Sequence, residues 1–382
     1  MELTIQQADL AYAVGKAFGS VSAKSPMPLL ACLLVEADKH GLRVTGSDLD
    51  VTTAVTVPCT VKAVGKVAVS ARHFNEVVRK IPRGLLQITI AGEQCEVRYG
   101  DGKGWSRFPI QDASDFPRVP ELKAETQASL AGDALARLIT RTLYAASTDA
   151  TRPNLSGVFI QGGDKQLTCV ATDGHRLAKA SRKGGFGSLG KDGVIVPTRA
   201  LAAVSRAAEE ATSPVSVEVA AGKNQAGFTT QVGDFKVQIL ARLLQGPYPN
   251  YEQVIPKNNP RDLKVKRLEL LEAVDIVASH ADNVTRQVRF SVSEGRLGVS
   301  SATELGAGEH TIGAEFKGEG LEIGYNATYL IDILRSFENE QVLFRLNNAL
   351  TAGVVEPVGE LKQAEEDLLC LVMPLRLPDA AG

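Results

Sequence analysis

The chain repeats itself three times, and this feature limits its possible folds more than any other. The segments 32–54, 157–180 and 288–310 each read as an alternating apolar strand, a turn with Gly or Asp, and a second alternating strand. Leu42, Leu167 and Leu297 take equivalent places, 125 and 130 residues apart. Three copies in one order at one period indicate a triplicated domain, because this period is too long for a solenoid repeat.

Other segments recur at the same period. Apolar residues at helical spacing open each copy, in 5–18, 129–146 and 265–281. A strand followed by an amphipathic helix comes later in each copy, in 67–81, 194–208 and 323–337. The Pro-bearing pieces 115–120 and 248–256 are typical of connectors. The sequence therefore predicts an α+β fold of three domains, 1–125, 126–260 and 261–382, each with two helices and roughly eight mostly antiparallel strands.

Composition excludes several classes of protein. The chain has 382 residues and a formal net charge of −2, which argues against an overall basic surface for nucleic acid but leaves a local basic face open. The start, MELTIQQADL, has no basic region followed by an apolar run, and no stretch approaches the length of a membrane span. We expect a soluble, cytoplasmic protein. The five cysteines and five histidines show no metal-ligand spacing, so we expect no metal and no cofactor.

Basic residues recur on the predicted helices. Arg72, Arg79 and Lys80 share one helical face, and Arg137 with Arg141, and Arg199 with Arg206, do the same in the second copy. Each face alone reads as the solvated side of an amphipathic helix. Their recurrence raises a second interpretation, in which repeated domains place basic helices on one shared surface that holds a polyanion loosely.

Motifs for catalysis are weak. GFGSLG at 185–190 fits a dinucleotide-binding pattern, but a turn and a strand follow it where that site needs a helix, so a hairpin loop is the better interpretation. The segment ATDGHRLA at 171–178 places Asp173, His175 and Arg176 within four residues. A turn at Asp173-Gly174, a binding surface and a catalytic site all remain open for it on local evidence.

Four motifs together resemble a known family. ATDGHRLA (171–178), YPNY (248–251), IGYNATYLIDIL (323–334) and VMPLRL (372–377) occur in the order and spacing of the bacterial DNA polymerase III beta subunit, the replicative sliding clamp. The similarity covers the whole chain. It implies three clamp-type domains per chain and a head-to-tail homodimer that forms a six-domain ring around double-stranded DNA.

The resemblance implies a non-catalytic processivity factor with several partners. A separate ATP-driven clamp loader opens the ring in that family. The DNA polymerase III alpha subunit and other clamp-motif proteins dock a short peptide into a pocket. Carried over by position, the pocket comprises Leu155, Thr172, Gly174, His175, Arg176, Leu177, Pro249, Val254, Asn326, Tyr329, Leu350, Val372, Met373, Pro374, Leu375 and Arg376.

The pocket residues suit such a role. Their apolar members can form a well for Leu or Phe anchors, and His175, Arg176, Asn326 and Arg376 can orient the peptide backbone. Met373 adapts its shape, as a site with many partners requires. The departures Gln253, Thr285 and Leu375 from the family pattern are expected to change which peptides bind best. The tail after Leu377 is expected to lie beside the pocket.

The resemblance also implies DNA-facing and dimer residues. Lys24 and Arg152 match positions near the duplex, although Asp149 beside Arg152 weakens that assignment. With the basic helices, the DNA-facing set is Lys24, Arg72, Arg79, Lys80, Arg137, Arg141, Arg152, Arg199 and Arg206. The expected dimer interface comprises Arg98, Lys103, Arg107, Phe108, Ile110, Ser279, His280 and Glu304.

Two other functions compete with the clamp. A hydrolase or nuclease would use Asp173 and His175, but the chain offers no second acid–base cluster for it. A clamp-like peptide-binding scaffold, or a paralogue without a main replicative role, would bind peptide without ring-dependent retention on DNA. Retention on nicked circular DNA separates these hypotheses.

Overall fold

The computed structural model describes residues 1–22, 27–117, 122–163, 165–189, 192–220, 222, 224–304 and 306–377. These residues form two compact units. The first unit comprises Met1–Arg137, Phe186–Gly190 and Val196–Leu244, and the second comprises Leu138–Gly185, Lys191–Ile195 and Gln245–Gly382. The boundary passes through the middle repeat. Among the described residues, no helix is both long enough and apolar enough to span a membrane.

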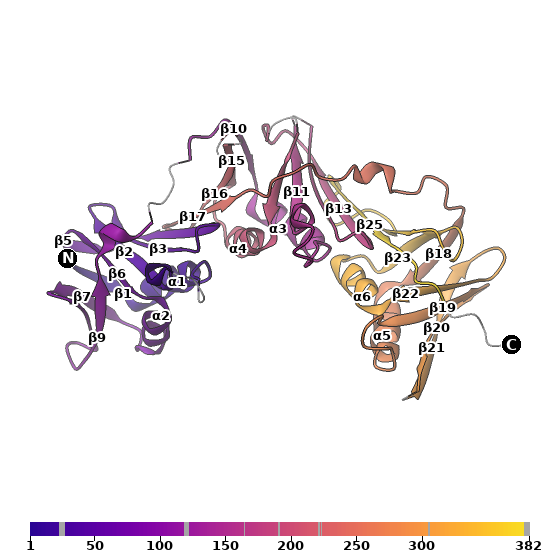
Figure 1. Ribbon diagram of the computed structural model, residues 1–382, viewed down its shortest axis with the longest axis horizontal. Helices are drawn as coiled ribbons and strands as arrows, with labels where there is room; N and C mark the ends of the chain where they lie inside the picture. The colour runs from indigo at the N-terminus through magenta and orange to yellow at the C-terminus, as the bar shows by residue number, and fades with distance from the viewer. Residues whose placement is uncertain are drawn as a thin grey trace. The chain divides into compact units, whose positions relative to one another are not determined.

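The first unit is built on one sheet (Figure 1). Its thirteen strands follow the spatial order β10 (Thr126–Leu130), β15 (Val215–Ala220), β16 (Gln225–Val232), β17 (Phe235–Arg242), β4 (Val51–Val57), β3 (Gly41–Ser47), β2 (Cys32–Asp38), β6 (Gly65–Ser70), β9 (Gly104–Gln111), β8 (Gln94–Tyr99), β7 (Leu85–Ala91), β1 (Glu2–Gln6) and β5 (Thr60–Ala63). The described pairings are antiparallel. The predicted antiparallel class is confirmed here.

The second sheet has twelve strands, and all but part of its first strand lie in the second unit. Their spatial order is β14 (Val194–Pro197), β11 (Gly157–Gly162), β12 (Gln166–Thr172), β13 (Arg176–Lys183), β25 (Glu366–Val372), β24 (Gly353–Pro357), β23 (Gln341–Leu346), β18 (Arg261–Lys266), β21 (Gly306–Phe316), β20 (Arg296–Thr303), β19 (Gln287–Ser293) and β22 (Leu321–Asn326).

Six helices accompany these strands in the described residues. They are α1 (Gln7–Phe18), α2 (Ala71–Lys80), α3 (Gly132–Leu143), α4 (Thr198–Glu209), α5 (Arg267–Ala278) and α6 (Ala327–Ser336). Two helices fall in each predicted repeat, and the hairpins β2–β3, β11–β12 and β19–β20 fall in the three aligned segments. The predicted elements are confirmed. The division into three domains remains a prediction, because the compact units cut across it.

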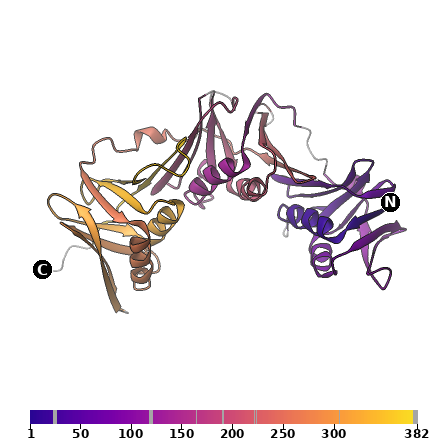
Figure 2. The ribbon, with the colours of Figure 1, turned by 180° about the vertical axis from the view of Figure 1, so that it is seen from behind.

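Each sheet buries one face under helices. In the first unit, α1 packs against α2 and against β3 and β4, burying Leu10, Ala13, Val14 and Ala17. In the second unit, α5 packs against α6 and against β20 and β21 (Figure 2). Apolar residues at helical spacing on the helices and at every second position on the strands produce these cores.

The connectors cover small apolar patches on the sheets. In the first unit, Ala113 and Phe116 pack with Cys32, Leu34 and Ala68. In the second unit, Tyr248, Tyr251 and Ile255 pack on a cluster formed by Val170, Leu177, Val354 and Leu371. Both Pro-bearing pieces therefore have anchoring side chains, as their role as connectors requires.

The glycine-rich segment 185–190 is not a dinucleotide site. Gly187 forms a β-bridge with Ala128, and the carbonyl of Phe186 accepts a hydrogen bond from the Ser129 amide at 2.8 Å. The next described element is the strand β14, where a phosphate site would need the start of a helix. The predicted strand after this segment is confirmed. The predicted hairpin loop is wrong, because β13 and β14 are not neighbours in the sheet.

Candidate functional site

The corner between β12 and β13 is a turn stabilised by its own side chains. The amides of His175 and Arg176 donate to Oδ1 of Asp173 at 2.9 and 3.0 Å. Gly174 has φ 93°, a region that favours glycine, and its amide donates to Oγ1 of Thr172 at 3.1 Å. Asp173 and Gly174 therefore form the turn that the sequence predicts. Since the Asp173 carboxylate accepts these bonds, it has a structural role here.

The two motifs that lie nearly 200 residues apart in the sequence are neighbours in the sheet. β13 pairs with β25, and Arg176 lies opposite Val372 in that register. The amide of Met373 then donates to the carbonyl of His175 at 2.8 Å. The predicted proximity of ATDGHRLA and VMPLRL is confirmed.

Arg176 ties this corner to its surroundings. Its Nε donates to Oδ2 of Asp173 at 3.1 Å, and its two terminal nitrogens donate to Oδ2 of Asp332 at 2.6 Å and to the carbonyl of Tyr144 at 2.5 Å. The guanidinium also lies 4.5 Å from the ring centroid of Tyr329. The side chain is only 11% exposed. Arg176 therefore holds the corner between β12 and β13 against its neighbours. We assign it this structural role in place of the predicted direct contact with a peptide.

The connector after β17 is held by two tyrosines. Tyr248 stacks on Phe159 with centroids 5.0 Å apart, and its hydroxyl donates to the carbonyl of Val170 at 3.3 Å. Tyr251 packs near the same ring at 6.3 Å. These anchors leave the side chains of Pro249 and Val254 exposed. Both tyrosines belong to the motif YPNY, and the sequence analysis assigned them no role. Two aromatic residues close together in a connector are a signal that could have indicated that they anchor it to the sheet.

The segment after β25 is fastened to β22. The amide of Leu375 donates to the carbonyl of Gly324 at 2.8 Å, and Nε2 of Gln287 donates to the carbonyl of Arg376 at 2.9 Å. Asn326 caps α6, because its Oδ1 accepts from the amide of Tyr329 at 3.2 Å, and its Nδ2 donates to the carbonyl of Thr285. The side chain of Asn326 is thus already used within the protein. The residues after Leu377 lie outside the described part of the chain.

The predicted pocket residues differ in exposure. Among them Leu155, Leu177 and Val372 are buried, Thr172, Arg176, Asn326, Tyr329, Pro374 and Leu375 are half-buried, and Gly174, His175, Pro249, Val254, Leu350, Met373 and Arg376 are exposed. Large apolar side chains that stay exposed in a folded chain favour a binding surface. Val254, Leu350 and Met373, at 59%, 66% and 41% exposure, are the candidates for contact with a ligand.

The tyrosines around the corner stay neutral. Burial raises the pKa of the Tyr144 hydroxyl and that of Tyr248 well above the usual range. Burial, and then the negative charge of Asp173, also raise the pKa of Tyr329, against the opposing effect of Arg176. The site therefore offers hydroxyl groups and no phenolate. No group of three or more His, Cys, Asp or Glu side chains suited to a metal ion occurs in the part of the chain that the structure describes.

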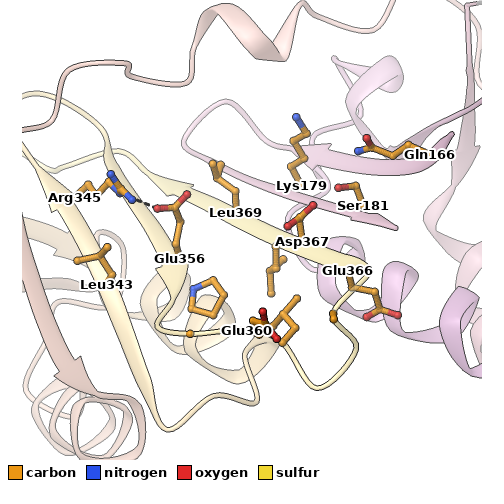
Figure 3. Close-up of a pocket in the computed structure, with 15 residues that line it drawn as sticks. Gln166, Lys179, Ser181, Leu343, Arg345, Glu356, Glu360, Glu366, Asp367 and Leu369 are labelled. Atoms are coloured by element: carbon orange, nitrogen blue, oxygen red, sulfur yellow. Dashed lines mark hydrogen bonds and ion pairs between the residues drawn. The ribbon is translucent and has the colours of Figure 1, made fainter. Parts of the chain in front are cut away.

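A separate cavity of about 570 Å³ opens in the same unit (Figure 3). Lys179 and Ser181 from β13, Asp367 and Leu369 from β25 and Glu356 from β24 line it, and Glu356 accepts from Arg345 at 2.8 Å. It contains none of the predicted peptide-pocket residues. This cavity is therefore separate from the predicted peptide pocket.

Some of the predicted DNA-facing side chains are exposed on α2. Arg72, Arg79 and Lys80 are exposed there, and Lys80 pairs with Glu76 one turn earlier at 2.7 Å. Arg206 on α4 is also exposed. Arg137 pairs with Asp133 at 2.8 Å, and Arg152 with Asp149 at 3.2 Å, as the presence of Asp149 led us to expect. The pairs of Lys80 and Arg152 are exposed on both sides and therefore weak, so a phosphate can compete for these two side chains, whereas Arg137 is half-buried.

The structure corrects one member of the DNA-facing set, Arg141, and gives a second, Arg199, partners within the chain. Arg141 is 3% exposed, and its guanidinium donates to the fully buried carboxylate of Glu366 at 2.5 Å. Arg199 donates to Asp48 and to the carbonyls of Gly19 and Val21. The Arg141 guanidinium is used inside the protein, so it is not assigned to DNA contact. The Arg199 side chain is 50% exposed, so its place in the DNA-facing set remains a prediction. Lys24 lies outside the described residues.

Two strands of the predicted dimer interface have open edges. Residues 104–109 of β9 pair with β8 on one side, and β6 pairs only with Ile110 and Gln111. Residues 306–313 of β21 pair with β20, and β18 pairs only with 314–316. Within the described residues, the other edges of both segments have no strand beside them. An open row of amides and carbonyls is a template for another strand.

The side chains at these edges differ from the sequence-based assignment. Phe108 is 1% exposed and packs against Phe74 of α2, with centroids 5.0 Å apart, so it belongs to the core and not to an accessible interface. Arg98 and Arg107 both pair with Glu96 of the same chain, at 2.5 and 2.7 Å. His280 lies against Gly308 of β21, where an added Cβ would come within 2.5 Å of its ring. Ile110 is half-buried, and Lys103, Ser279 and Glu304 are exposed.

Comparison with known proteins gives one consistent result. Models of the DNA polymerase III beta subunit match in succession, with the N-terminal domain at residues 1–120, the central domain at 129–250 and the C-terminal domain at 252–376. The beta sliding clamp of Caulobacter vibrioides (strain NA1000 / CB15N) is 30% identical over 384 residues, covering 99% of this chain and 100% of that protein. The Escherichia coli (strain K12) beta sliding clamp is 28% identical over 382 residues, with the same coverage.

Solved structures agree with these sequence matches. A sliding clamp from Bartonella birtlesii bound to griselimycin superposes with a TM-score of 0.90 at 26% identity. The DNA polymerase III subunit beta from Pseudomonas aeruginosa superposes with a TM-score of 0.89 at 28% identity. Each match covers 99% of this chain and 100% of the other.

Proposed function

The chain belongs to the DNA polymerase III beta subunit family, and we propose that it acts by closing around duplex DNA as a head-to-tail dimer. Its function is that of a DNA sliding clamp, a processivity factor in DNA replication. It is a non-catalytic subunit. The observation that carries the function is the match of three successive beta subunit domains along the chain.

A closed ring accounts for the charge of the chain. A net charge of −2 is too little for tight electrostatic binding to DNA, whereas a ring is retained by its topology. The exposed Arg72, Arg79 and Arg206 support weak contact with phosphates and no base readout. We assign the dimer contact to the open edges of β9 and β21 in two copies of the chain. We place the protein in the cytoplasm with the DNA it serves.

Peptide docking is assigned to the surface around Met373. Val254, Leu350 and Met373 offer exposed apolar contact, and His175 lies beside Met373 through the backbone bond described above. Arg176 holds this surface in shape. We propose that the DNA polymerase III alpha subunit, the clamp loader and other clamp-motif proteins insert Leu or Phe anchors there.

Loading on nicked circular DNA is expected to separate this function from its alternatives. After loading by a clamp loader, the protein should remain on a circular duplex for minutes and leave within seconds once a restriction enzyme makes the circle linear. Gel filtration of DNA-bound, labelled protein measures both. Equally fast loss from circular and linear DNA would refute a topological hold and leave the peptide-binding scaffold.

Met373→Ala is expected to weaken peptide binding about 10- to 30-fold, because it removes an apolar contact at the centre of the surface. Fluorescence anisotropy with a labelled peptide that carries Leu and Phe anchors measures the change. Val284→Ala is the matched control, since Val284 is 88% exposed in the same unit and outside the proposed surface. Equal affinities for both variants would remove Met373 from the site.

A further inference from the structure

We propose that the indole of Trp105 anchors the dimer by entering a cavity beside β21 of a second copy of this chain. The inference rests on the proposed ring dimer. It goes further by naming the side chain that holds the two copies together and the place that receives it.

Trp105 is exposed at an open strand edge. It lies on β9, in the segment whose other edge has no strand beside it in the described residues, and it is 56% exposed. Side chains alternate along a strand, so Trp105 and Arg107 point away from the helix-covered face that buries Phe108. The Arg107 guanidinium lies 4.4 Å from the Trp105 ring centroid. A large exposed aromatic at a strand edge favours contact with another chain.

A cavity of about 590 Å³ lies beside the other open edge. Ser300 and Ala302 of β20 and Ala307 of β21 contribute small side chains to its wall. The other lining residues are Asp282, Thr285, Gln287, Arg289, Ser301, Gly308, Glu309 and Leu377. Gly308 faces His280 at the end of α5, so its neighbours Ala307 and Glu309 point to the face without helices. The cavity and Trp105 are therefore on corresponding faces of their sheets.

Edge-to-edge pairing of β9 with β21 would bring these features together. It would continue one sheet into the other, with the helices of both copies on the same side and Trp105 beside Ala307 and Glu309. A Trp side chain buries about 150–250 Å² when covered, and small neighbours leave room for it. The cavity volume accommodates an indole.

Charge favours the same arrangement. Glu309 lines the cavity, and Arg107 lies over the indole that would enter it. Arg98 and Arg107 are already paired with Glu96, so exchanging that partner for an acid of the second copy would add little to the free energy of dimerisation. The structure therefore points to the buried aromatic contact, and not to ion pairs, as the main source of dimer affinity.

The test measures the dimer dissociation constant of the full chain. Trp105 is the only tryptophan, so its emission reports its own burial, and it should shift to shorter wavelength as the protein dimerises. Sedimentation velocity across a dilution series gives the constant independently. Trp105→Ala is expected to raise it at least about 30-fold, as for an interface hot spot. Ala302→Trp, which fills the receiving cavity from within, is expected to weaken the dimer of the otherwise unchanged chain.

Leu85→Ala is the matched control. Leu85 is 55% exposed on β7, which lies beyond β8 from β9, and its removal should leave the dimer unchanged. A dimer dissociation constant that Trp105→Ala leaves unchanged, or a wild-type emission that does not shift as the dimer forms, would overturn the inference and leave the clamp function intact. A wild-type chain that stays monomeric and is not retained on circular DNA would instead overturn the proposed function, and the inference with it.

Discussion

Glu366→Gln is expected to lower the free energy of unfolding by about 3–5 kcal/mol, because it leaves two arginines without their shared counter-charge in the protein interior. The Glu366 side chain is fully buried and accepts from Arg141 at 2.5 Å and from Arg182 at 2.9 Å. The Arg141 side chain is only 4% exposed, so water cannot solvate its charge once Glu366 is neutral. Urea unfolding followed by circular dichroism, at fixed protein concentration, measures the loss.

Asp367→Asn provides the control in the same strand. Asp367 is 63% exposed and lies 3.7 Å from Lys183, also exposed, so its replacement should change stability by less than about 1 kcal/mol. If both variants unfold at the same urea concentration as the wild type, the arginines are not held by Glu366. The ion pairs assigned to it here would then be wrong.

Arg176→Lys is expected to cost about 2–4 kcal/mol of stability and to weaken peptide binding, although the positive charge is kept. A lysine has one ammonium in place of a planar fork, and it cannot reach Asp173, Asp332 and the carbonyl of Tyr144 together. The corner and α6 would then be less firmly joined. Thermal unfolding and peptide anisotropy measured on the same samples test both effects.

The coupling between Arg176 and Asp332 gives a sharper test. The double variant Arg176→Lys, Asp332→Asn should lose less stability than the sum of the two single variants, because they remove the same contact. Arg335→Lys is the control, since Arg335 is exposed on α6, the helix that carries Asp332, and lies outside the predicted pocket. Strict additivity would show that the Arg176–Asp332 contact contributes nothing measurable.

The features that sequence reasoning predicted correctly depend on local pattern. The three hairpins, the six helices and the turn at Asp173 and Gly174 follow from apolar periodicity and turn chemistry, which neighbouring residues determine. The adjacency of His175 and Met373 was predicted only through the family resemblance. Nothing in the two segments alone indicates that β13 pairs with β25.

The sequence-based assignments that the structure corrects depend on contacts between a side chain and elements far away in the sequence. Spacing places Arg137 and Arg141 on one side of α3, yet Arg141 is buried against Glu366, which comes from a strand 225 residues later in the chain. Arg199, which stays exposed, pairs with Asp48 from an earlier repeat. Phe108 was assigned to an interface through the family resemblance, but alternation along the strand turns its side chain toward α2. Such partners are brought together by tertiary packing, which periodicity does not encode.

The pairing of β17 with β4 and of β13 with β25 has a consequence for dissecting the chain. These ladders join strands from different repeats, so a fragment cut near residue 125 or 260 would lose hydrogen-bonded neighbours along a whole strand. Strand edges that lose their partners in this way pair with other chains, so the fragment would aggregate. Truncation is therefore a poor route to single repeats, because each cut exposes strand edges that the whole chain keeps paired.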